Sequence, residues 1–75
     1  MVGKTLNEAP VGHWQRIAAD GTRNLRLIEL GFLPLERVKV LRRSWFRSGA
    51  LVVQVGDAVF GLRPAEAGQV MLEPA

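Results

Sequence analysis

The segment NLRLIELGFLP, residues 24–34, most constrains the fold, because it predicts one helix that is firmly stopped among segments typical of strands. Leu27 and Leu30 lie three residues apart and would share one face of that helix. Gly31 follows at the position where a left-handed residue commonly ends a helix. Pro34 then prevents the helix from resuming, because proline lacks the backbone donor and its ring blocks the helical path. The fold must therefore place a single short helix against strands.

The helix is predicted over Thr22–Leu30. Asp20-Gly21 is a turn signal in front of it, and Thr22 or Asn24 carries a short polar side chain that can cap the first turn. We expect its apolar stripe to belong to the core rather than to a docking site, because a surface helix needs one buried face. The stripe consists of Leu27, Ile28, Leu30 and Phe32.

Five short strands are predicted from the alternation of apolar and polar residues and from the turn residues between them. They span residues 12–19, Arg37–Arg43, Ala50–Val55, Ala58–Arg63 and Val70–Glu73, with a helical turn at residues 64–68 before the last strand. The strand residues expected on the inner face include Val38, Val40, Val53, Val55 and Leu62. The register of the first strand stays open, because Trp14 and Ile17 point to opposite faces at a period of two.

A chain of 75 residues has room for one domain, over residues 1–75. The predicted fold class is mainly β. Five short strands curl into a small barrel, which protects the strand edges. One short α-helix between the first two strands closes an open end of the barrel, and a short helical turn precedes the last strand.

The segments LRLIELGFLP, RVKVLRR and VQVGDAVFGLRPAEAGQVMLEP together resemble the FeoA family of bacterial ferrous iron transport proteins, over about residues 6–73. The resemblance implies an SH3-like barrel, similar to the C-terminal domain of iron-dependent repressors. It also implies a cytoplasmic accessory protein that binds the GTPase-bearing part of the FeoB permease. The sequence departs from the family where Leu35 follows Pro34, since glycine commonly takes that position in a type II turn. The turn at Pro34-Leu35 must therefore be of another type or carry strain in its backbone. Trp14 stands at a position that is usually small, and the loop 44–49 is unusually aromatic.

Basic and aromatic residues gather around that loop, and the chain carries ten Lys/Arg against seven Asp/Glu. Arginine and tryptophan are enriched among the residues that dominate protein interfaces, and a basic surface favours an acidic partner. The candidate partner-binding residues are Arg26, Arg42, Arg43, Trp45, Phe46 and Arg47. For Trp45 an interface position and a core position are equally favoured, and for Phe46 a core position is slightly favoured over an interface position.

No catalytic constellation is apparent, so we expect no enzyme. The chain has one histidine and no cysteine or tyrosine, and it contains neither a phosphate-binding loop nor a paired base and nucleophile. His13 is the candidate metal ligand, although its simplest role is that of a polar residue near a strand. No cofactor is required, and zinc or iron at His13 would be adventitious or bound between two molecules.

Two other functions remain open at this stage. A metal-responsive regulatory domain would need at least two organised ligands. A small nucleic-acid-binding barrel would need basic and aromatic residues on one face and a steep salt dependence. No apolar run reaches the roughly 18 residues of a membrane span, and no signal peptide is apparent, so a cytoplasmic location is expected. An open sheet edge or the loop around Trp45 could also support a homodimer.

Overall fold

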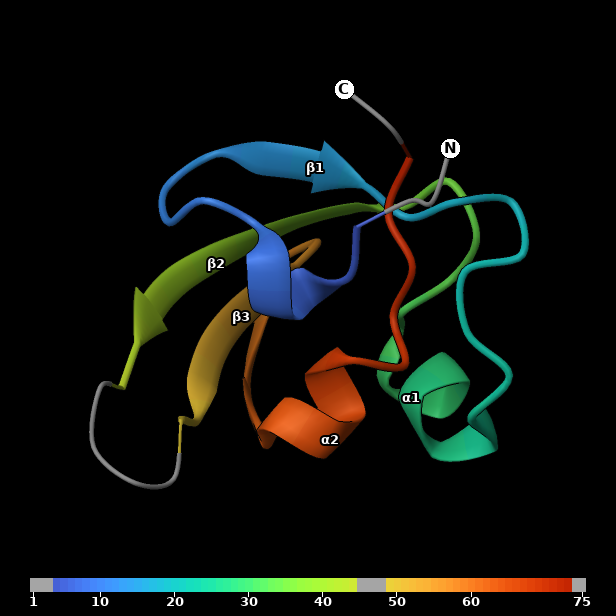
Figure 1. The fold of residues 1–75 in the computed structure, drawn as a ribbon. Helices are drawn as coiled ribbons and strands as arrows, with labels where there is room; N and C mark the ends of the chain where they lie inside the picture. Colours follow the sequence, from blue (N-terminus) through green and yellow to red (C-terminus); the bar gives the residue numbers. More distant parts are fainter. Residues whose placement is uncertain (1–3, 45–48, 74–75) are drawn as a thin grey trace.

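The computed structural model describes residues 4–44 and 49–73. The elements in chain order are the 3₁₀-helix η1 (Leu6–Glu8), β1 (Trp14–Arg16), α1 (Leu25–Leu30), β2 (Arg37–Arg43), β3 (Leu51–Val55), β4 (Ala58–Leu62) and α2 (Pro64–Ala67). The strands form one antiparallel sheet in the order β1-β2-β3-β4. Figure 1 shows this curved sheet with α1 and α2 beside each other at one end. The fold is therefore mainly β, with a short α-helix between the first two strands, as predicted.

The closed five-stranded barrel is not confirmed, because the segment expected to be a fifth strand forms no strand of the sheet. It is attached instead by isolated bridges, Met71 to Thr5 and Leu72 to Ile17. The N–H of Glu73 also donates to the carbonyl oxygen of Arg16 over 2.8 Å. These bonds cover part of the outer edge of β1 without completing a ladder. The first strand is likewise shorter than the predicted range of residues 12–19.

Local capping explains both ends of α1. At its start Asn24, one of the two predicted caps, accepts a hydrogen bond from the Arg26 N–H through its side-chain oxygen. At its end Gly31 takes a left-handed conformation with φ of 112°. The N–H groups of Gly31 and Phe32 donate back to Ile28 and Leu27, the paired bonds of a Schellman motif. This motif turns Phe32 into the core, where it is fully buried.

The core lies between the inner face of the sheet, the two helices and the C-terminal segment. Its buried members are Leu6, Ala9, Ile17, Leu27, Phe32, Val38, Val40, Leu51, Val53, Val55, Leu62, Ala67, Val70 and Leu72. Leu30 and Phe60 pack against this cluster while remaining partly exposed, and the rings of Phe32 and Phe60 lie 5.9 Å apart. The five strand residues named for the inner face, Val38, Val40, Val53, Val55 and Leu62, are thus all buried in this core.

The turn after α1 keeps the type II backbone although leucine, and not glycine, stands at its second central position. Pro34 and Leu35 occupy the two central positions, and Leu35 has a φ of 67°, the conformation that favours glycine. It is the only described residue other than glycine with a positive φ. Of the two outcomes left open by the sequence, the turn therefore carries strain.

One irregularity in β2 decides which way its last residues point. Val40 pairs with Val53, but the next pair joins Arg42 to Val52, so Leu41 is an extra residue between them. Such a bulge reverses the alternation of the strand. Arg43 consequently lies opposite the buried Leu51, on the inner side of the sheet, whereas Arg42 is exposed.

Candidate interaction surface

The outer face of β1 and β2 carries one indole surrounded by cations. Trp14 lies directly opposite Lys39, and Arg16 lies directly opposite Arg37. Because side chains two residues apart point to the same face of a strand, these four side chains share the outer face. We call them the Trp14 patch. Arg37 Cζ lies 4.7 Å and Lys39 Nζ lies 4.6 Å from the ring centre of Trp14, distances at which a cation is attracted to the aromatic face.

No carboxylate among the described residues neutralises the cations of the Trp14 patch. Between described residues the only ion pair joins Arg26 to Glu66 at 3.7 Å, on the two helices. Arg16 and Arg37 are exposed, Lys39 is half-buried and Trp14 is 40% exposed. The patch therefore presents an accessible ring together with three positive charges that no carboxylate of the described chain pairs.

The residues expected to bind a partner are distributed over different surfaces. Arg26 lies exposed on α1, and Arg42 is exposed on the outer side of β2. Trp45, Phe46 and Arg47 lie outside the described residues.

Arg43 is engaged within the chain. Its guanidinium donates to the carbonyl oxygens of Asn7 and Ala9, each over 2.7 Å, and to that of Leu6 over 3.5 Å. These carbonyl groups belong to η1 and its C-terminal cap. This geometry gives Arg43 a structural role, because it joins the end of β2 to the N-terminal helix.

His13 lies exposed immediately before β1. In the described part of the chain no three residues among histidine, aspartate and glutamate come together in a way that could hold a metal ion. A single exposed imidazole supplies one ligand, whereas metal sites in proteins generally use three or four. A metal site at His13 remains a prediction.

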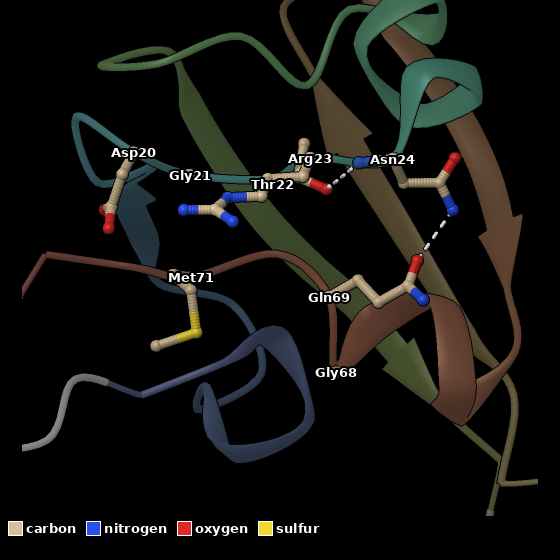
Figure 2. A pocket seen from close by; sticks show the side chains of 8 residues that line it. All are labelled: Asp20, Gly21, Thr22, Arg23, Asn24, Gly68, Gln69 and Met71. Atoms are coloured by element: carbon tan, nitrogen blue, oxygen red, sulfur yellow. Dashed lines mark hydrogen bonds between the residues drawn. The ribbon is translucent and has the colours of Figure 1, made fainter.

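A hollow with a volume of about 460 Å³ lies where the loop before α1 meets the segment after α2. Figure 2 shows the side chains around it, among them Asp20, Thr22 and Met71. Its two walls are joined by a hydrogen bond of 2.6 Å from Asn24 Nδ2 to Gln69 Oε1. Its lining includes the Asp20 carboxylate and the Thr22 hydroxyl, but this hydroxyl accepts a hydrogen bond of 3.1 Å from the Asn24 N–H, and no hydrogen bond between described residues pairs it with a base.

The sequence contains a signal for the Trp14 patch. W-x-R in β1 and R-x-K in β2 each place two such residues on one face. Only the register of the two strands brings the pairs together, and the local pattern does not specify that register. Clustering along the chain favoured residues 42–47 instead.

The fold defines a small, mainly β domain built on one four-stranded antiparallel sheet. Comparison with solved structures identifies the fold as SH3-like. The chain shares this fold with Stenotrophomonas maltophilia FeoA, described as a prokaryotic SH3 domain protein complexed with zinc. The two are 32% identical, with a TM-score of 0.75 over 93% of this chain and 89% of that one. The sequence profile of the FeoA domain matches residues 4–74. The chain belongs to the FeoA family, which is associated with ferrous iron transport.

Two further solved structures have the same fold at lower identity. Iron(II) transport protein A from Clostridium thermocellum has a TM-score of 0.78 and 24% identity, over 93% of this chain and 44% of that one. A protein described as an iron uptake regulatory protein (FeoA) has a TM-score of 0.76 and 20% identity, over 96% of both chains. No curated protein sequence matches the chain. No helix in the described ranges has the length and apolar character needed to cross a membrane.

Proposed function

We propose that this protein is a cytoplasmic accessory component of bacterial ferrous iron uptake that binds the GTPase-bearing region of the FeoB permease. The observation that carries the proposal is the match to the FeoA domain across residues 4–74. The relative from S. maltophilia is described in connection with activation of ferrous iron transport. An exposed basic face, whose cations form no ion pair with a described carboxylate, adds support, because it would speed the encounter with an acidic partner.

The chemistry of the described residues favours binding over catalysis. Among the described residues, the hollow and the Trp14 patch contain no hydrogen-bonded pair of base and nucleophile. FeoA proteins are small accessory proteins rather than members of a known enzyme family. We therefore propose that the protein influences iron uptake through its contact with the permease and needs no cofactor for that contact.

The test is an amide-resolved NMR titration of the protein with the cytosolic GTPase region of FeoB, loaded with a GTP analogue in moderate salt. Saturable shifts confined to one surface are the expected result. A flat response at high micromolar partner would show the proposal to be wrong for this pair.

A separate titration with zinc or ferrous iron addresses the metal-responsive alternative, which the zinc complex of the relative keeps relevant. We expect at most weak binding near His13. Tight binding that also changes the affinity for the permease would favour the regulatory domain, because two ligands that bias each other's binding are the mark of an allosteric sensor.

A further inference from the structure

The Trp14 patch holds two like charges against a single ring. Both Arg37 Cζ and Lys39 Nζ approach the centre of the Trp14 indole, at 4.7 and 4.6 Å. The two cations are therefore closer to each other than about 10 Å, the distance over which salt at about 0.1 M screens charges. Arg16 adds a third positive charge across from Arg37. The patch consequently has a local positive potential that an anionic group would relieve.

We propose that the Trp14 patch is the surface with which this protein docks its permease partner, and that it takes an acidic segment of that partner. The inference rests on the proposed function and adds the docking face and the chemistry of the partner's surface. Carboxylates are the expected groups because a guanidinium binds them through two parallel hydrogen bonds. The exposed part of the Trp14 ring supplies apolar contact beside those charges, the combination found at interface hot spots.

The geometry of the patch favours an ordered protein segment. The ring limits the positions of the cations on Arg37 and Lys39, so part of the entropy of ordering them is already lost in the free protein. Their side chains come from one strand at alternate positions. An extended segment with carboxylates at alternate positions has the same spacing, because both backbones repeat every two residues.

Other anionic partners fit this surface less well. Single-stranded nucleic acid is bound by several exposed rings on which successive bases stack, and Trp14 is the only exposed aromatic residue in the described ranges. Part of its ring is already occupied by Arg37 and Lys39. A lipid surface is bound by apolar side chains that enter the bilayer boundary, whereas the neighbours of Trp14 on this face are charged.

The experiment measures the affinity of the full chain for complete FeoB permease in immobilised nanodiscs, loaded with a GTP analogue. Empty nanodiscs of the same lipids, rich in phosphatidylglycerol, and an immobilised single-stranded oligonucleotide serve as the competing surfaces. The test variants are Arg37→Glu/Lys39→Glu and Trp14→Ala. The matched control is Arg23→Glu/Arg63→Glu, which makes the same change in net charge at exposed positions elsewhere. Circular dichroism verifies that every variant is folded.

We expect the charge reversal in the patch to weaken binding to the permease at least about tenfold, and Trp14→Ala to weaken it by about threefold or more. The control should stay within about twofold of the wild type, because distant rim charges contribute little to affinity. Increasing salt should weaken the wild type more than the patch variant.

Three results would overturn the inference. If the patch variant binds permease discs as tightly as the wild type, the docking face is elsewhere, while the proposed function stands. If the wild type binds empty discs or the oligonucleotide as tightly as permease discs, the occupant is a membrane or a nucleic acid. If the wild type binds none of these surfaces, both the proposed function and the docking face are wrong.

Discussion

The N–H of Glu36 donates to the carbonyl oxygen of Leu33 over 3.1 Å, and this bond closes the turn between α1 and β2. The two residues enclosed by the bond are Pro34 and Leu35. Proline suits the first central position, but the second requires a positive φ, where Leu35 has 67°. The left-handed conformation costs a residue with a Cβ about 1–2 kcal/mol. The turn therefore forms despite the side chain at position 35.

Glycine should be better than alanine at this position. Leu35→Gly and Leu35→Ala both remove the leucine side chain, so their difference isolates the backbone. We expect the glycine variant to be more stable by about 0.5–1 kcal/mol, since relief of the left-handed strain exceeds the extra entropy of glycine in the unfolded chain. Urea unfolding of both variants measures the difference. The same pair at Leu33, which lacks a positive φ, should show the opposite order, and an identical order at both positions would contradict the assignment of strain.

Arg43 should contribute to stability more than its neighbour Arg42. Arg43→Met removes the donors to three carbonyl groups around η1, and we expect a loss of about 2 kcal/mol in the free energy of unfolding. Arg42→Met, at an exposed position, should change it by less than about 0.5 kcal/mol. Chemical denaturation provides both values. Equal effects of the two substitutions would show that the guanidinium does not hold η1 in solution.

Acidification should weaken the N-terminal segment through Glu8. The hydrogen bond of 2.7 Å from the Thr5 N–H to Glu8 Oε1, then the hydroxyl of Thr5 and the charge of Lys4, hold the pKa of Glu8 below its ordinary value of 4.5. A carboxyl whose pKa is lower in the folded state stabilises the protein fully above its unfolded pKa. This stabilisation is lost as pH falls through the folded pKa.

The test compares wild type and Glu8→Gln by urea unfolding at a series of pH values. Glutamine can keep the capping hydrogen bond but cannot titrate, so the variant should lose less stability than the wild type as pH falls below 4.5. Glu29→Gln, at an exposed position on α1, serves as the control and should follow the wild type. Parallel curves for wild type and Glu8→Gln would argue against this linkage.

Asn24 should matter for two separate reasons. Its Oδ1 accepts the Arg26 N–H over 3.0 Å, which caps α1, and its Nδ2 donates to Gln69 over 2.6 Å, which joins the two walls of the hollow. Asn24→Ala removes both bonds and should cost about 1–2 kcal/mol. Gln69→Ala removes only the second and should cost about 0.5–1 kcal/mol, as measured by thermal or urea unfolding. A loss for Asn24→Ala no larger than that for Gln69→Ala would mean that the cap contributes nothing.

The parts of the fold that local chemistry determines could be predicted from the sequence. The end of α1 at Gly31 and the bounds of β2 follow from residue types that act within a few positions. The hairpin between β3 and β4 follows in the same way, from the glycine-aspartate turn and the flanking alternation.

Features that depend on pairing between distant segments could not be predicted in this way. The alternation of Val70–Glu73 suited a strand, yet the segment forms only isolated bridges. Trp14 and Lys39 meet because of a register between strands separated by α1, which no local pattern specifies. For the same reason the sequence favoured residues 42–47, which are neighbours along the chain, whereas the structure brings together the Trp14 patch from two strands.

The bulge at Leu41 makes the pairing of β2 with β3 as important as the composition of β2. Two adjacent arginines, identical in chemistry, hold opposite positions, with Arg43 bonded to the carbonyl groups around η1 and Arg42 in solvent. Loss of the bulge with Leu41 retained would pair Leu41 with Val52 and exchange these positions, placing Arg42 over the interior and releasing Arg43, whereas deletion of Leu41 would leave both arginines where they are. In related chains, the arginine that performs the structural role is therefore recognised by the presence of a bulge before it, and a strand without the bulge would give that role to the preceding residue.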